Sequence, residues 1–524
     1  MDSGGKEGRL IRSTAAVAVP TLISRILGYF RDLFLAFFLG TGHDADAFTI
    51  AFIIPNLFRR LTGEGALSAS FIPAYVEIDR QGDKKRLARF AGAFFADSAV
   101  FLAVLTGLGI VFAPALVSAI APGFRDTAGK WESTVAMTRI MFPYLFFVSL
   151  AALASALLNA RGRFFLPAAH PVAFNLVLIA GAIFWAGRST QPALVFAAAV
   201  LAGGILQLAV LIPWLIKKGG GLRLQPSFRD PDVRRTAGLL VPGFLGVGVY
   251  QINLAVSRML ASGLEPGSTS ALYYSSRVEE LTMGLFSIAL SVVLLPQFSA
   301  SAADRDLGGM RRTLEFSLKL TALVTVPAAF GLAVLSRPMI RVLFERGQFG
   351  GGSTEMSASC LLFFAAGLPF VSGVKILTPA FFSLKDTFSP VKAGIFVVAI
   401  NIGLAIVLAR SMRVGGLAAA LSASQVVNFI ILLVWVQKKI GWLAAKNSLL
   451  FTGKAVLAAA IMAAAVNAFY AGLIRKAGTF LYQAAVLFGT IAVGLIVYAV
   501  LISLLNPGGI RKIIGEIRAG REEP

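Results

Sequence analysis

Long apolar runs recur along almost the whole chain, and they constrain its fold more than any other feature. A helix of about 20 apolar residues crosses the hydrocarbon layer of a membrane, and stretches such as 320–335 are longer than a soluble core needs. Of the 524 residues, 57% are hydrophobic and only 14% are charged, whereas soluble proteins carry roughly a quarter charged residues. A membrane β-barrel would show short alternating segments instead. We therefore expect an all-α polytopic membrane protein.

Hydrophobic length and periodicity predict about fourteen transmembrane helices. The expected spans are 13–40, 46–62, 87–115, 133–160, 165–187, 191–217, 233–261, 268–300, 312–335, 353–384, 388–410, 415–438, 449–473 and 479–506. No stretch between them is long enough for a separate soluble domain.

Basic residues gather in alternate loops, which predicts the orientation. If the N-terminus is cytoplasmic, the loops on its side hold most of the lysine and arginine, including the 80–89, 217–235 and 438–446 regions and the C-terminal tail. This pattern matches the positive-inside rule. Both termini are then expected in the cytoplasm, and the net charge of +22 needs no nucleic acid partner to explain it.

The first twelve spans resemble two copies of one six-helix unit. Five landmarks recur in order at offsets of 221 to 226 residues: Pro20 and Pro242, Pro73 and Pro296, Pro143 and Pro369, Asn175 and Asn401, and Trp214 and Trp435. Parallel repeats of this kind are typical of transporters, whose substrate site lies between the halves. We predict an N-terminal lobe over 1–218, a C-terminal lobe over 219–441, and two additional spans with a basic cytoplasmic tail over 442–524.

Eight basic residues inside the expected spans are candidates for a polar cavity: Arg25, Arg31, Arg59, Arg60, Arg139, Arg258, Arg277 and Lys375. A mid-membrane arginine costs roughly 2.5–3.5 kcal/mol on insertion scales, so such residues usually face a polar cavity. Several arginines in one cavity would bind an anion, and the planar guanidinium suits phosphate.

Local explanations compete for some of these charges. Arg60 and Glu64, four residues apart, have the spacing of a helical ion pair, and Arg277 and Glu280 are three apart. Arg139 lies early in its span, where it can reach the interface. Lys375 is either a second cavity charge or the partner of a carboxylate.

Two motifs resemble the MurJ/MviN family of lipid II flippases, within the MOP transporter superfamily. They are "SRILGYFRDLFLAFFLGTGHDADAFTIAFIIPNLFRRLTGEGALSASFIPAYVE", from Ser24, and "YYSSRVEEL", from Tyr273. The resemblance implies alternating access that moves undecaprenyl-pyrophosphate-linked disaccharide-pentapeptide across the bacterial cytoplasmic membrane for cell wall synthesis. It implies lipid II, membrane lipids and cell wall synthesis proteins as partners, and a groove for the lipid tail on the last two spans.

The resemblance also assigns roles to residues. Those implied to bind the pyrophosphate are Arg25, Arg31, Arg59 and Arg277. Those implied to act as gating or counter-charges are Asp32, Asp46, Glu64 and Glu280. Arg60, Arg258 and Lys375 remain secondary candidates.

The chain departs from some relatives in one respect. Where those relatives hold sodium with carboxylates in the seventh and eleventh spans, this sequence offers Gln251, Asn253, Ser257 and Asn401. This departure argues against the sodium site of those relatives and leaves the energy source of the protein open. Separately, the sequence contains no arrangement that predicts a metal site or a cofactor.

Other functions remain open alternatives. An exporter of another polyprenyl-linked glycolipid would share the cationic cavity, whereas a MATE-like drug/cation antiporter would favour carboxylates there. A membrane glycosyltransferase or phosphatase needs paired acids for a metal or a histidine nucleophile. The two histidines, His43 and His170, are isolated. A non-transporting scaffold would leave the intramembrane arginines unexplained.

Overall fold

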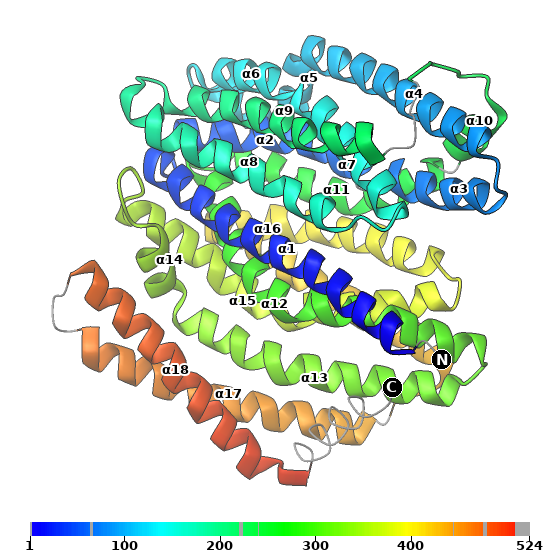
Figure 1. Ribbon diagram of the computed structural model, residues 1–524. Helices are drawn as coiled ribbons and strands as arrows, with labels where there is room; N and C mark the ends of the chain where they lie inside the picture. Colours follow the sequence, from blue (N-terminus) through cyan, green and yellow to red (C-terminus); the bar gives the residue numbers. More distant parts are fainter. Residues whose placement is uncertain are drawn as a thin grey trace. The chain divides into compact units, whose positions relative to one another are not determined.

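Helices make up the regular structure of the part of the chain that the computed structural model describes, namely residues 3–62, 67–218, 224–238, 240–443, 445–474 and 479–508 (Figure 1). The helices of the first half are α1 (Ser3–Leu39), α2 (His43–Leu61), α3 (Ser68–Arg80), α4 (Lys84–Val111), α5 (Ala113–Ile120), η2 (Pro122–Asp126), α6 (Lys130–Met141), α7 (Tyr144–Ala160), α8 (Phe165–Phe184), η3 (Ala186–Arg188), α9 (Pro192–Lys218), α10 (Pro231–Gly238) and α11 (Leu240–Ser262). Those of the second half are α12 (Ser268–Ala303), α13 (Leu307–Val334), α14 (Ser336–Phe344), α15 (Gly351–Ser383), α16 (Phe388–Ile440), α17 (Ala445–Ile474) and α18 (Phe480–Leu505). These ranges contain no strand, so the expected all-α class is confirmed.

Within the described ranges, nine helical segments are long and apolar enough to cross a membrane. One of them is α16, which contains two of the expected spans. Arg413 breaks it with φ +50° and ψ −132°, between the spans predicted at 388–410 and 415–438. The helices α1, α2, α11 and α12 are not among the nine, and they carry six of the eight candidate basic residues. Adding these four and counting α16 twice accounts for the expected fourteen.

Packing divides the chain into two units, residues 1–270 with 346–349 and residues 271–345 with 350–524. The first unit includes α10 and α11, and α11 packs against α2, α5 and η2. The sequence placed these two helices in the C-terminal lobe, and the predicted lobe boundaries stay predictions. In the second unit, α17 and α18 lie side by side, and α17 packs along α13 (Figure 1).

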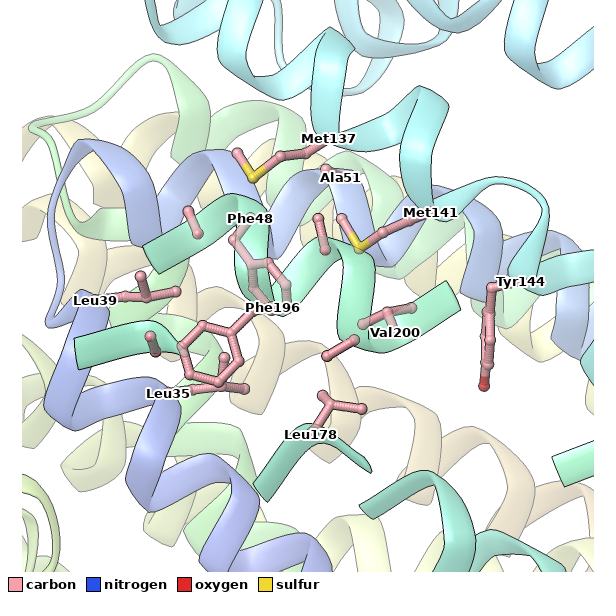
Figure 2. Close-up of a cluster of buried hydrophobic side chains, with 14 of the residues drawn as sticks. Leu35, Leu39, Phe48, Ala51, Met137, Met141, Tyr144, Leu178, Phe196 and Val200 are labelled. Carbon is pink, nitrogen blue, oxygen red and sulfur yellow. The ribbon is translucent and has the colours of Figure 1, made fainter. Parts of the chain in front are cut away.

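A cluster of buried side chains holds the helices of the first unit together. Phe48 and Phe196 lie near its centre, with ring centroids 6.1 Å apart (Figure 2). Helix α9 approaches its neighbours closely through two glycines. A Cβ atom at Gly204 would lie 2.6 Å from the Tyr144 ring, and one at Gly203 would lie 2.7 Å from the Phe174 ring. Small residues permit such close packing of membrane helices, and here they allow α9 to pack closely against α7 and α8.

The segment before α11 is fixed to α4 by charges. Arg86 donates two hydrogen bonds to Asp232, at 2.8 and 2.6 Å. The hydrogen bond from Arg86 lowers the pKa of the Asp232 carboxyl below its usual range, although partial burial opposes the shift. The backbone N–H of Ser227 donates to Asp97 at 2.8 Å. These contacts hold the start of α10 against the first turn of α4, and the non-helical stretch before α10 against the middle of α4.

Candidate functional site

Arg31 is held between an acid of its own helix, α1, and an amide of α8. Its Nε and Nη2 both donate to Asp32 Oδ1, at 3.0 and 2.7 Å. Its Nη1 donates to Asn175 Oδ1 of α8 at 3.2 Å, and its guanidinium lies 5.8 Å from the centre of the Phe174 ring. The side chains of Arg31 and Asp32 are 14% and 4% exposed. Arg31 is thus a largely buried cation whose charge is balanced by the neighbouring Asp32.

Asn175 links this cation to the backbone of α1. Its Nδ2 donates to the carbonyl of Ser24 at 3.0 Å, so the amide oxygen is aimed at Arg31. The sequence marked Asn175 only as a repeat position and missed this role. The recurrence with Asn401, which is also fully buried, was the available signal.

The other candidate arginines of the first unit, Arg25, Arg59 and Arg60, differ in how exposed they are. Arg25 is exposed on α1. Arg59 lies in the last turn of α2, where its Nε donates to Asn56 Oδ1 at 2.9 Å. Asn56 is itself fixed by a hydrogen bond to the carbonyl of Phe52 at 2.8 Å. Arg60 is half-buried, and Glu64, its expected partner, lies outside the described residues.

The second unit contains a separate charged group on α12 and α15. Arg277 donates to Glu280 Oε2 at 2.6 Å, and its guanidinium lies 4.7 Å from the centre of the Tyr273 ring. The local pairing that the spacing suggested is therefore present. Lys375 interacts electrostatically with Glu280 and with Glu279, a neighbour that the sequence analysis did not single out.

Asp46 is almost fully buried, and both of its carboxylate oxygens are occupied. Oδ2 accepts from Lys130 Nζ and from the backbone N–H of Gly267, each at 2.7 Å. Oδ1 accepts from the backbone N–H and the hydroxyl of Ser270, each at 2.8 Å. The sequence suggested an arginine as the partner of Asp46. In this structure its cation is Lys130, which lies just before the span expected at 133–160.

Arg258 lies near the C-terminal end of α11 and contacts the same turn as Asp46. It is buried, and its Nη1 donates to the carbonyl of Thr269 at 2.7 Å. Thr269 belongs to the first turn of α12, so Arg258 and Asp46 hold the same turn from two sides. This placement favours a structural role for Arg258.

The residues that replace the sodium ligands of some relatives are buried as well. They are Gln251, Asn253 and Ser257 on α11 and Asn401 on α16. Within the described ranges, no group of three or more histidine, cysteine, aspartate or glutamate side chains is arranged to hold a metal ion.

Comparisons with known proteins identify the family of this chain. The sequence profile of the family described as Lipid II flippase MurJ matches residues 35–505. The "Probable lipid II flippase MurJ" of Vibrio cholerae is 34% identical, over 87% of this chain and 89% of its own. The "Lipid II flippase MurJ" of Burkholderia cenocepacia is 34% identical, over 82% of this chain and 84% of its own.

Comparison with solved structures indicates the same family. The structure titled "Lipid II flippase MurJ, inward closed conformation" has a TM-score of 0.79 and 26% identity, and the match covers 94% of this chain and 99% of that one. An inward-facing multidrug resistance MATE transporter of the MOP superfamily has a TM-score of 0.69 at 13% identity, covering 83% of this chain and 99% of its own, and shares the fold alone. The chain therefore belongs to the lipid II flippase MurJ family.

Proposed function

We propose that this protein translocates lipid II from the cytoplasmic to the outer leaflet of the bacterial cytoplasmic membrane, as a transporter without a catalytic step. The relatives named as lipid II flippases support this function. The charges add a chemical reason, because the polar part of such a lipid includes a pyrophosphate and the charged helices carry arginines. By the loop charges, both termini face the cytoplasm.

One observation carries the assignment of the site: the Arg31 guanidinium is pre-oriented but is already paired with Asp32. A fixed fork of this kind can exchange a carboxylate for a phosphate without reorganising its own side chain. Arg277 and Glu280 form a similar pair, and their side chains are 30% and 44% exposed. Pairs with this much exposure contribute little to stability, so the pair separates at low cost.

The proposed cycle uses these pairs as a two-state switch. The pyrophosphate binds Arg25, Arg31, Arg59 and Arg277 while the sugars and peptide occupy the cavity and the polyprenyl tail stays in the bilayer. Asp32 and Glu280 then take back their arginines when the headgroup leaves on the outer side. A ligand shifts such an equilibrium only through its different affinity for the two states.

The test is lipid II translocation in reconstituted vesicles. We expect Arg25→Ala and Arg277→Ala to abolish most of the transport, and Arg277→Lys to impair it, because lysine keeps the charge but loses the bidentate fork. Arg139→Ala is the matched control. Arg139 is an exposed span arginine that contacts the carbonyl of Ile110, and its loss should leave transport intact. Normal transport by well-expressed Arg25→Ala and Arg277→Ala proteins would refute the site.

A further inference from the structure

The contacts of Asp46 form a helix cap supplied by another helix. The first N–H groups of a helix lack partners within it and carry a partial positive charge. Gly267 precedes α12 and Ser270 is its third residue, and both N–H groups donate to Asp46 of α2. Gly267 has φ +97°, and a Cβ atom there would lie 2.6 Å from the carbonyl oxygen of Thr41. The start of α12 is thus closely fitted to the α1–α2 turn.

Lys130 pairs with the capping carboxylate of Asp46, although its place at the start of a helix is unfavourable for a positive charge. It is the first residue of α6, and a positive charge at a helix N-terminus is unfavourable. Yet Lys130 is 3% exposed, next to an Asp46 that is 1% exposed. Its ammonium also lies 4.2 Å from the centre of the Phe124 ring. A lysine at such an unfavourable local position is explained by a contact made in the folded structure. Here that contact is the ion pair with the buried carboxylate of Asp46.

The turn that carries Phe124 is itself anchored to α11. The backbone N–H of Gly123 donates to Ser262 Oγ at 3.3 Å, and a Cβ atom at Gly123 would lie 2.4 Å from the Ser262 carbonyl oxygen. The ammonium of Lys130 therefore occupies a built, closed site formed by η2, α2, α6 and the start of α12.

We propose that Lys130 is a positioning residue for transport. It compensates the buried charge of Asp46 and so keeps that carboxylate aimed at the first turn of α12, the helix that carries Arg277. When the turn leaves Asp46 during transport, Lys130 stays as its partner, so the carboxylate is never left buried alone. The importance of this for transport rests on the proposed function, whereas the cap itself does not.

Cysteine accessibility tests the cap without any lipid II. Ser268, in the first turn of α12, is fully buried, so Ser268→Cys reports opening of this turn. Cys360 is the only native cysteine, and Cys360→Ala provides the background. The protein in lipid nanodiscs is treated with a polar maleimide, and the labelling rate is measured by mass spectrometry. Ala186→Cys, at the buried η3 turn of the same unit, is the control for general loosening.

We expect Lys130→Met to raise the labelling rate at position 268 about tenfold or more, because it leaves one partner of a buried ion pair alone. Asp46→Asn alone should also raise it, since the lysine is then left alone. The double variant Lys130→Met, Asp46→Asn should return towards the parent rate, because the asparagine oxygen can still accept from the two N–H groups. Labelling at position 186 should stay slow in every variant.

Two results would overturn the proposal. One is an unchanged rate at position 268 in Lys130→Met. The other is an equal rise at positions 186 and 268, which would mean that Lys130 only stabilises the fold. If the labelling follows the prediction while the parent protein does not transport lipid II in reconstituted vesicles, the proposed function fails and the cap stands.

Discussion

Replacing Asp32 by asparagine separates the stabilising contact with Arg31 that the structure shows from the competition with the substrate that we propose. Asp32 Oδ1 accepts two hydrogen bonds from Arg31. Hydrogen bonds to charged groups contribute about 1.5–3 kcal/mol and neutral ones about 0.5–1.5. Asparagine keeps an acceptor oxygen but not the charge. We therefore expect Asp32→Asn to lower the free energy of unfolding by about 2 kcal/mol.

The same change should strengthen substrate binding. In the proposed cycle, the pyrophosphate must displace Asp32 from Arg31, and breaking this contact weakens binding. Without the carboxylate this cost is absent, so binding of lipid II should be stronger by about the same free energy. About 2 kcal/mol corresponds to roughly a thirtyfold lower Kd for lipid II. The assays are chemical denaturation in detergent and equilibrium binding of lipid II to the purified protein.

Asp44→Asn is the matched control. Asp44 is an acid of the same unit, in the first turn of α2, but its side chain is 54% exposed and it pairs with the neighbouring His43. We expect a change in unfolding free energy below about 0.5 kcal/mol and unchanged binding. Weaker lipid II binding by Asp32→Asn would refute the idea that Asp32 competes with the substrate.

Three further predictions concern packing, pH and the connecting segment. Gly204→Ala should destabilise the first unit by about 1–3 kcal/mol through overpacking against Tyr144, measured by denaturation. Hydrogen bonds and a lysine outweigh burial and lower the pKa of Asp386, between α15 and α16, to about 2. Because this pKa is depressed, its stabilisation is present above about pH 4 and should fade as the pH falls towards 2, measured by thermal melts. Asp232→Asn should break the pair with Arg86 and speed tryptic cleavage in α10.

Each of these three has its own control. Gly107→Ala should be nearly neutral, because a Cβ atom there meets nothing within 4 Å. Asp386→Asn should remove the acid sensitivity assigned to this loop, and an unaltered pH profile would count against the assignment. Glu77→Gln, which breaks only the exposed pair with Arg235, should change tryptic cleavage less than Asp232→Asn. An equal effect of the two substitutions on cleavage would contradict the importance of the partly buried Arg86–Asp232 pair.

Much of this fold could be predicted because hydrophobic length is a property of the sequence itself. The break at Arg413 falls between two predicted spans, and the Arg277–Glu280 pair follows from helical spacing. The partners of Asp46 could not be predicted in this way. Gly267 and Ser270 are more than 200 residues away in the chain, and they bind through backbone N–H groups, which carry no sequence signal.

The missed residue Lys130 shows a second limit. A lysine beside a loop looks like any other interfacial charge, and only its burial reveals that it neutralises Asp46. Asn175 was singled out for its recurrence, but the hydrogen bonds that aim its amide at Arg31 depend on how α8 packs against α1. Gly28 of α1 lies at this contact, where a Cβ atom would be 3.7 Å from Asn175 Nδ2, and such a contact depends on three-dimensional fit.

The central claim is that arginines recognise the pyrophosphate of the lipid. The most direct measurement compares the equilibrium binding of lipid II with that of an analogue in which a neutral linker replaces the pyrophosphate, for the parent protein and for Arg31→Gln. We predict that the parent protein prefers lipid II by at least about tenfold, as expected for loss of a bidentate charged contact. The preference should shrink markedly in Arg31→Gln. Equal binding of the two lipids by the parent protein would contradict the account.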